Sequence, residues 1–364
     1  MAHRAHNFSA GPAVLPVPVL EEIQRDLLSL PDVAASILEI SHRGTPFLHI
    51  LQQAEADLRA LLSIPEDYAV LFLQGGSRLQ FSMVPMNLLG EQFPSATYIV
   101  TGSWGKYAAS EARKEATVEV GWDGQTTNFD RLPQSHQLQI NPAAGYVHFT
   151  SNETIQGVQF ATEPITGNTP LVCDASSDFL SRPIPIKKYG LIYACAQKNA
   201  GPAGVTVVII RRDLLERSRN SLPGYLNYKN HADANSLMNT PPTFAIYALG
   251  LVARWLKNEI GGLENMLEHN RMQAKLLYDV LDESVGFYTG HAQPNCRSLM
   301  NVTFNLPDDS LTAAFLKEAE KHNLNSLKGH RSVGGIRASI YNAMPTTGVE
   351  QLASFMVDFR NKNS

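Results

Sequence analysis

The sequence is poor in cysteine and contains no long apolar run. Only three cysteines, Cys173, Cys195 and Cys296, occur in 364 residues. An odd number without metal-ligand spacing argues against a disulfide framework and a metal site. No apolar run approaches the roughly 20 residues that a membrane helix needs, and no basic segment precedes an apolar one at the N-terminus. We therefore expect a cytoplasmic protein with neither a metal ion nor a membrane partner.

The sequence also lacks a strong excess of either charge. Thirty lysines and arginines stand against thirty-four aspartates and glutamates, which gives a formal net charge of −4. No basic run is long enough to follow a phosphate backbone, so nothing indicates a nucleic-acid partner. With 44% hydrophobic and 18% charged residues, the composition is typical of a globular protein. The length suggests one large domain and a smaller one.

Short apolar runs rich in β-branched and aromatic residues alternate with helical patterns in the first two thirds of the chain. Strands of this kind, separated by helices, predict an α/β fold with a mostly parallel sheet. An apolar spacing of three or four predicts a helix over 45–62, and an earlier helix is predicted to run through Leu30. The predicted strands are 68–73, 97–100, 117–120, 146–149, 171–174, 191–196 and 205–210.

The pattern changes after Pro241 and Pro242, where helices dominate. This change predicts a second, α+β domain packed on the first. Its predicted elements are helices over 243–258, 263–283 and 311–322, a strand over 299–304 and a final helix from Gly348.

Lys198 is the first candidate for chemistry, because it follows the apolar run 190–196 at a strand exit. Ligand sites in parallel sheets lie at the carboxyl ends of the strands. Gly201, Ala203 and Gly204 leave space behind the lysine, where a planar cofactor could lie against the backbone. A partly desolvated lysine can attack a carbonyl group. Most lone lysines at strand exits simply reach water, so the position alone leaves both interpretations open.

Asp174 and Trp104 also follow predicted strands. A carboxylate at a strand end can cap a turn, or it can keep a pyridine nitrogen protonated so that the ring withdraws electrons. Trp104 lies between Gly102 and Gly105, so we expect it to be exposed and able to stack on a flat ring. Packing in the core is the alternative.

Two further features suit anions. The turn 74–78 joins a predicted strand to a helix, a geometry that binds phosphate, although it matches neither a dinucleotide nor a nucleoside-triphosphate motif. Arg43, His330, Arg331 and Arg337 lie in or near glycine-flanked segments. Such residues are often surface charges, but if they converged they could hold a phosphate and a carboxylate.

Short motifs follow one another along nearly the whole chain. They are 7–12 (NFSAGP), 41–44 (SHRG), 80–81 (QF), 152–155 (NETI), 196–199 (AQKN), 201–204 (GPAG), 239–244 (NTPPTF), 328–331 (KGHR) and 337–343 (RASIYNA). With these motifs the chain resembles the phosphoserine aminotransferase family, whose members are pyridoxal-phosphate enzymes of fold type I. The resemblance implies a large domain with a mostly parallel seven-stranded sheet and a smaller α+β C-terminal domain. It divides the chain into 1–15, which joins the small domain, 16–258 and 259–364.

The resemblance implies a role for each matching residue. Lys198 would form the Schiff base with pyridoxal 5'-phosphate and act as the acid-base catalyst, Asp174 would pair with the pyridine nitrogen, and Trp104 would stack on the ring. The other implied cofactor residues are Thr154, Gln197, Ser77, Arg78 and, across a homodimer, Asn239 and Thr240. For Arg78 a contact with substrate stays open beside one with cofactor. The implied substrate residues are Ser9, Arg43, His330, Arg331 and Arg337.

The implied reaction transfers the amino group of L-glutamate to 3-phosphohydroxypyruvate, which gives O-phospho-L-serine and 2-oxoglutarate in serine biosynthesis. Use of 4-phosphohydroxythreonine, a step of pyridoxine biosynthesis, stays open. A cysteine desulfurase is disfavoured, because only Cys296 lies outside the predicted strands. An alanine–glyoxylate type transaminase would leave His330 and Arg331 without a purpose. A catalytically silent phosphate-binding protein of the same fold is the alternative from another class.

Overall fold

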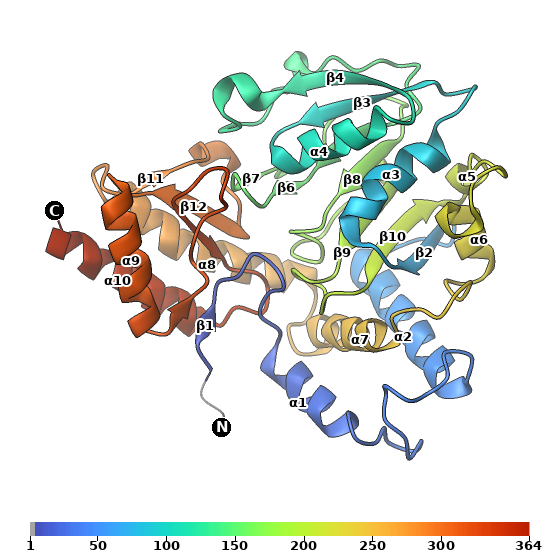
Figure 1. Cartoon of the computed structure of the whole chain (residues 1–364), viewed down its shortest axis with the longest axis horizontal. Coiled ribbons are helices and arrows are strands. Elements are labelled where there is room, and N and C mark those ends of the chain that lie inside the picture. Colours follow the sequence, from blue (N-terminus) through green and yellow to red (C-terminus); the bar gives the residue numbers. More distant parts are fainter. Residues whose placement is uncertain (1–3, 364) are drawn as a thin grey trace.

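A seven-stranded sheet forms the centre of the structure, a computed structural model that describes residues 4–363 (Figure 1). The strand order is β2-β10-β9-β8-β5-β3-β4. β10 runs antiparallel to both neighbours, and the other neighbouring pairs are parallel. The predicted mostly parallel seven-stranded sheet is confirmed. Its strands are β2 (Tyr68–Leu73), β3 (Ser95–Val100), β4 (Thr117–Asp123), β5 (Val147–Thr150), β8 (Leu171–Asp174), β9 (Tyr189–Cys195) and β10 (Thr206–Arg211).

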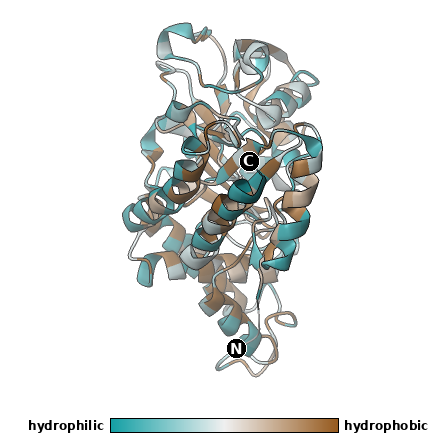
Figure 2. Cartoon of the chain, turned by 90° about the vertical axis from the view of Figure 1, so that its left-hand side faces the viewer, coloured by the Kyte–Doolittle hydropathy of each residue, from teal (hydrophilic) through white to brown (hydrophobic). Residues whose placement is uncertain are grey.

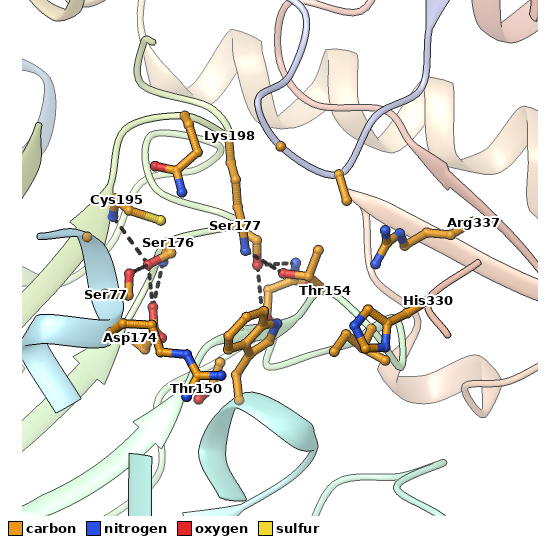
Figure 3. A pocket seen from close by; sticks show the side chains of 18 of the residues that line it. Ser77, Thr150, Thr154, Asp174, Ser176, Ser177, Cys195, Lys198, His330 and Arg337 are labelled. Carbon is orange, nitrogen blue, oxygen red and sulfur yellow. Dashed lines mark hydrogen bonds between the residues drawn. The ribbon is translucent and has the colours of Figure 1, made fainter. Parts of the chain in front are cut away.

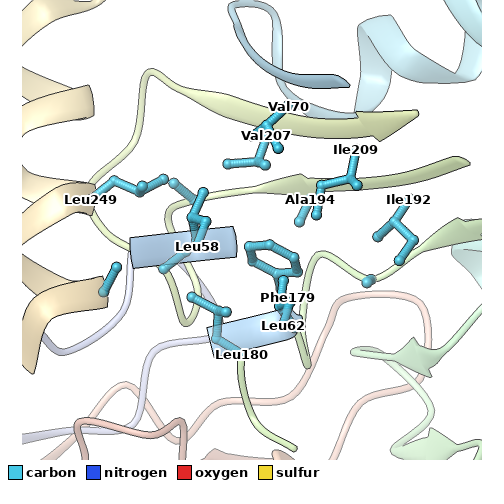
Figure 4. Packing of buried hydrophobic residues seen from close by; sticks show 14 of the residues in the cluster. Leu58, Leu62, Val70, Phe179, Leu180, Ile192, Ala194, Val207, Ile209 and Leu249 are labelled. Carbon is cyan, nitrogen blue, oxygen red and sulfur yellow. The ribbon is translucent and has the colours of Figure 1, made fainter. Parts of the chain in front are cut away.

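Helices cover both faces of this sheet. On one face, α2 and α7 pack on strand residues such as Val70 and Ile192, as Figure 4 shows for Leu58 and Leu249. On the other face, α3 and α4 pack on the alternate strand positions, such as Leu71. Burial on both faces explains why the strands appear in the sequence as unbroken apolar runs. The helices of this part are α1 (Val17–Asp26), α2 (Thr45–Leu62), α3 (Gly76–Leu88), α4 (Ser103–Ala112), α5 (Arg212–Leu215), α6 (Tyr228–Asp233) and α7 (Thr243–Asn258).

The C-terminal part, from α8 onward, packs three helices around a small antiparallel sheet of order β11-β12-β14. Figure 2 views the molecule from this side and shows helices that are hydrophilic on one face and hydrophobic on the other. The N-terminal strand β1 (His6–Asn7) pairs with β13, and Phe8 enters the core of this part. The elements are α8 (Leu263–Asp282), β11 (Thr289–Gly290), β12 (Asn301–Asn305), α9 (Asp309–Lys321), β13 (Leu324–Asn325), β14 (Ile336–Ser339) and α10 (Thr346–Asn363). The domain bounds 1–15, 16–258 and 259–364 stay a prediction.

A hairpin of β6 (Asn152–Glu153) and β7 (Val158–Gln159) leaves the large sheet after β5 and lies beside α4 (Figure 1). It bonds to the C-terminal part, because Thr303 Oγ1 donates to the Gln156 carbonyl at 2.9 Å. Within residues 4–363, no helix combines the length and the apolar character that crossing a membrane requires.

Most predicted elements are present, and several have the predicted bounds, including the helices over 45–62 and 243–258. The helix predicted to run through Leu30 is wrong at its end, because α1 ends at Asp26. The buried Asp26 accepts a hydrogen bond from Tyr247 Oη at 2.6 Å, whereas Leu28 is 87% exposed. Because Leu28 faces solvent, the apolar residues after Asp26 do not extend the buried face of α1.

Replacing Leu58 with alanine tests the core between α2 and the sheet. Leu58 is fully buried there, so the substitution removes apolar contacts and leaves a cavity. We expect a loss of about 2–5 kcal/mol in the free energy of unfolding. Ile165→Ala, at an exposed loop position, is the matched control and should change it by less than about 0.5 kcal/mol. Urea unfolding followed by circular dichroism measures both, and equal midpoints for the two variants would contradict this packing.

Candidate active site

A cavity of about 420 Å³ lies at the carboxyl edge of the large sheet, between the sheet and the C-terminal part (Figure 3). The starts of α3 and α4 and the turn after β9 also contribute to its walls. The structure brings together in this cavity nine of the residues predicted from the sequence, namely Ser77, Arg78, Trp104, Thr154, Asp174, Gln197, Lys198, His330 and Arg337.

Lys198 reaches into the middle of the cavity from the turn that follows β9 (Figure 3). Its Nζ donates a hydrogen bond of 2.7 Å to Thr154 Oγ1 and lies 5.6 Å from the centroid of the Trp104 ring. Gly11 approaches its stem closely, since a Cβ at this glycine would lie 3.4 Å from Lys198 Cγ. The side chain is thus restrained near its base by Gly11 and at its amine by Thr154.

Asp174 ends β8 and is buried on the opposite side of the cavity from His330 and Arg337 (Figure 3). Its Oδ1 accepts hydrogen bonds from Ser176 N at 3.0 Å and Ser176 Oγ at 2.5 Å. Burial raises the pKa of the Asp174 carboxyl, while the Ser176 hydroxyl and the Lys198 charge oppose this shift. A cationic group of a ligand placed here would further favour the charged carboxylate.

The turn that starts α3 is open and positively polarised. Gly75 has φ +89°, and a Cβ there would lie 2.5 Å from Leu79 Cδ2, so this position requires glycine. At Gly76, with φ +64°, a Cβ would meet no atom within 4 Å. No side chain caps this helix, and its first N–H groups therefore remain available for an anion such as phosphate.

Trp104 is not the exposed residue that its flanking glycines suggested. It lies in the first turn of α4 and is half-buried, because it packs against the apolar core between the sheet and helices α3 and α4. The Arg78 guanidinium lies 4.5 Å from the Tyr107 ring centroid and 5.6 Å from that of Trp104. The predicted contact of Arg78 with the cofactor, and the alternative contact with substrate, both stay predictions.

The wall opposite Asp174 carries His330 and Arg337, which come from the C-terminal part (Figure 3). Burial lowers the pKa of Arg337. Burial also lowers the pKa of His330, and the charges of Arg337 and Arg331 lower it further. A bound anion would reverse these shifts, because it favours the charged forms of both side chains. This wall is suited to a negatively charged ligand.

The other five predicted site residues do not line the cavity of this single chain. Ser9 immediately precedes Ala10 and Gly11, which do line it. Arg43 lies in the turn before α2, and Arg331 is exposed beside His330. Asn239 and Thr240 precede α7, and Asn239 Nδ2 donates a hydrogen bond of 3.1 Å to Gln74 Oε1. Their roles stay predictions.

Sequence reasoning missed several residues of the cavity wall. These are Thr150, Asn152, Ile155, Ser176, Ser177 and Cys195. The strand-exit rule could have found Thr150, which ends β5 and pairs in register with Asp174. Ser176 and Ser177 directly follow Asp174, so the same rule could have included them.

The cavity fits a flat aromatic ligand with polar substituents and a phosphate. Trp104 Nε1 and Thr150 Oγ1 are both buried without a hydrogen-bond partner among the described residues, and both residues line the cavity. A ligand with polar groups would supply the missing partners. With the uncapped start of α3 for a phosphate, Asp174 for a ring nitrogen and Lys198 for an aldehyde, these groups match pyridoxal phosphate.

A family model described as aminotransferase class-V matches residues 5–352. The chain belongs to the class-V aminotransferases. Phosphoserine aminotransferase of Rhodopirellula baltica is 59% identical over 362 residues, covering 99% of this chain and 96% of that protein. The protein of the same name from Lysinibacillus sphaericus is 50% identical, and both chains are covered fully.

Solved aminotransferase structures agree with this assignment. Phosphoserine aminotransferase from Bacillus circulans subsp. alkalophilus superposes with a TM-score of 0.97 at 46% identity, covering 100% of both chains. A pyridoxal-phosphate-bound phosphoserine aminotransferase from Trichomonas vaginalis has a TM-score of 0.92 at 39% identity, covering 97% of this chain and 100% of that one. The aminotransferase described here is a pyridoxal-phosphate enzyme of fold type I.

Replacing Ser176 with alanine tests how the aminotransferase holds Asp174. The hydroxyl favours the carboxylate, so its loss should raise the Asp174 pKa further and weaken cofactor binding by about 3–30-fold. Titration of the cofactor-free protein with pyridoxal phosphate, followed by absorbance, measures the dissociation constant. Ser221→Ala, at an exposed position, is the control and should leave it unchanged. An unchanged constant for Ser176→Ala would show that this hydroxyl does not support the cofactor.

Proposed function

We propose that this aminotransferase transfers the amino group of L-glutamate to 3-phosphohydroxypyruvate, forming O-phospho-L-serine and 2-oxoglutarate in serine biosynthesis. The observation that carries the proposal is that His330 and Arg337, which an anionic ligand would hold in their charged forms, share one cavity with Lys198. We call this pair the cationic wall. The curated relatives named phosphoserine aminotransferase support the same substrate pair.

Each substrate carries two anionic groups, which the cationic residues would bind at separate places. We assign Arg337 to the α-carboxylate, because its guanidinium can form a two-pronged hydrogen-bonded pair with a carboxylate. His330, with the adjacent Arg331, is assigned to the substrate phosphate; the γ-carboxylate of glutamate, which carries less charge, would depend on the same pair less. Arg43 and Ser9 are assigned to substrate as well, on the family resemblance alone.

Pyridoxal phosphate, when bound, supplies an aldehyde that accepts the amino group and a ring that withdraws electrons from the substrate α-carbon. Lys198 Nζ would bind this aldehyde in the resting enzyme and would move the proton of the α-carbon as acid-base catalyst. Thr154 holds the same amine through its hydroxyl. Asp174 would keep the ring nitrogen protonated, Trp104 would cover one face of the ring, and Ser77, Arg78 and Gln197 would complete the cofactor contacts.

We further propose a cytoplasmic homodimer in which Asn239 and Thr240 bind the cofactor phosphate of the partner subunit. Both residues lie outside the cavity of their own chain, which agrees with a role in a second one. A substrate with a carboxylate and a phosphate in similar places, such as 4-phosphohydroxythreonine, suits the same cationic wall, so we include pyridoxine biosynthesis in the proposal.

The substrate assignment is tested by comparing phosphorylated with unphosphorylated 3-hydroxypyruvate. We expect the wild-type enzyme to prefer the phosphorylated acceptor in kcat/KM by at least about tenfold, because a charge-assisted hydrogen bond contributes about 1.5–3 kcal/mol. His330→Ala should lose most of this preference, while the half-reaction with glutamate changes less. His136→Ala, an exposed histidine, is the control. Equal losses in both half-reactions would contradict a phosphate-specific role, and no preference in the wild type would favour an alanine–glyoxylate type activity.

Mixing two inactive variants tests the shared site. Lys198→Ala should lose turnover by several orders of magnitude, and the double substitution Asn239→Ala with Thr240→Ala should bind cofactor weakly. In a hybrid dimer, one site would have its own Lys198 and the intact Asn239 and Thr240 of the other chain. We therefore expect activity at limiting cofactor to rise when the two variants are unfolded together and refolded. If the residues serve their own chain, or if the protein is a monomer, no activity will return.

A further inference from the structure

Helix α4, which carries Trp104, has no side-chain cap of its own. The first N–H groups of a helix have no partner within the helix and need one elsewhere. Here the Trp104 and Gly105 N–H groups donate to the two carboxylate oxygens of Glu153, at 2.9 and 2.8 Å. The Ser103 N–H donates to Gln156 Oε1 at 3.2 Å. The start of α4 is thus held by side chains from the hairpin of β6 and β7, which lies 49 residues later in the chain.

The contact between Glu153 and α4 is close and fully enclosed. Glu153 is completely buried. A Cβ at Gly102 would lie 2.5 Å from Glu153 Cδ, so the glycine is what lets the carboxylate reach the helix start. Burial raises the pKa of Glu153 to about 7, although the Gly105 and Trp104 N–H groups oppose this shift. Keeping a carboxylate here is costly, and a purely apolar packing role would not require one.

The same hairpin also positions the catalytic lysine. Thr154, the next residue after Glu153, accepts the hydrogen bond from Lys198 Nζ (Figure 3). Two consecutive residues therefore hold the backbone of Trp104 and the amine of Lys198. The Trp104 ring and Lys198 Nζ lie 5.6 Å apart, measured to the ring centroid.

We propose that Glu153 is a positioning residue that fixes the Trp104 ring over the cofactor relative to Lys198 by capping α4 from the hairpin. The inference rests on the proposed role of Trp104 at the cofactor. Glu153 itself does not line the cavity, so it acts through α4.

A double-mutant cycle on the cofactor dissociation constant tests the proposal. Glu153→Gln keeps the size of the side chain but has one oxygen in place of two, and its amide group would face a backbone N–H. We expect Glu153→Gln and Trp104→Ala each to raise the dissociation constant about tenfold, which corresponds to about 1.4 kcal/mol. Added to Trp104→Ala, Glu153→Gln should cost less than about twofold more, because contacting residues are not additive. The circular dichroism of bound cofactor should change in Glu153→Gln as it does in Trp104→Ala.

The outcomes separate this inference from the proposed function. If Trp104→Ala binds cofactor as tightly as the parent, the assignment of Trp104 is wrong. If Trp104→Ala weakens binding but Glu153→Gln does not, or if the two losses multiply in full, Glu153 is a structural residue and the positioning role is overturned.

Two further variants complete the design. Glu111→Gln, on the same helix and part of an exposed ion pair with Lys114, is the control and should leave cofactor affinity unchanged. Gly102→Ala would displace the Glu153 carboxylate without altering a residue that lines the cavity, and it serves where Glu153→Gln does not fold. Gly102→Ala alone should weaken cofactor binding, whereas adding it to Trp104→Ala should have little further effect on the dissociation constant. If the two losses of affinity were additive in free energy, the proposal would again be overturned.

Discussion

The site depends on one constraint of a parallel sheet, which brings the ends of neighbouring strands to a common edge. Thr150 and Asp174 occupy paired positions at the ends of β5 and β8, and Lys198 follows β9. A buried carboxylate, which is costly to remove from water, and a half-buried lysine amine thus face one cavity. A positive ring nitrogen offsets the cost of burying the carboxylate, an aldehyde can bind the amine covalently, and pyridoxal phosphate has both groups.

Much of this edge could be predicted from the sequence, because strands buried on both faces are continuous apolar runs with clear ends. That pattern predicts the parallel sheet, and it places Lys198 and Asp174 at the ends of strands. The short strands could not be found in this way. β1 and β13 have only two residues each, too few for a periodic pattern, and they form only because distant parts of the chain meet. Trp104 was expected to be exposed because its neighbours are glycines, but those glycines permit close packing of α4 instead.

The convergence of charges could not be predicted either. His330 and Arg337 reach the cavity only because the C-terminal part packs against the sheet edge, and local sequence has no signal for that contact. The resemblance to a family, and not the periodicity of the sequence, placed His330 and Arg337 at the site. Arg43, Asn239 and Thr240 do not line the cavity of this chain, and the role proposed for Asn239 and Thr240 needs a second subunit.

The hairpin of β6 and β7 explains how the two walls of the cavity keep their alignment. Asn152 Nδ2 donates to Ser177 Oγ on the sheet side and to Asn301 Oδ1 of β12, both at 2.8 Å. β12 in turn pairs with β14, where Thr303 lies opposite Arg337. The strand that carries Arg337 is therefore connected through buried hydrogen bonds to the hairpin, whose Thr154 bonds to Lys198. These connections favour a single arrangement of Arg337 relative to the lysine.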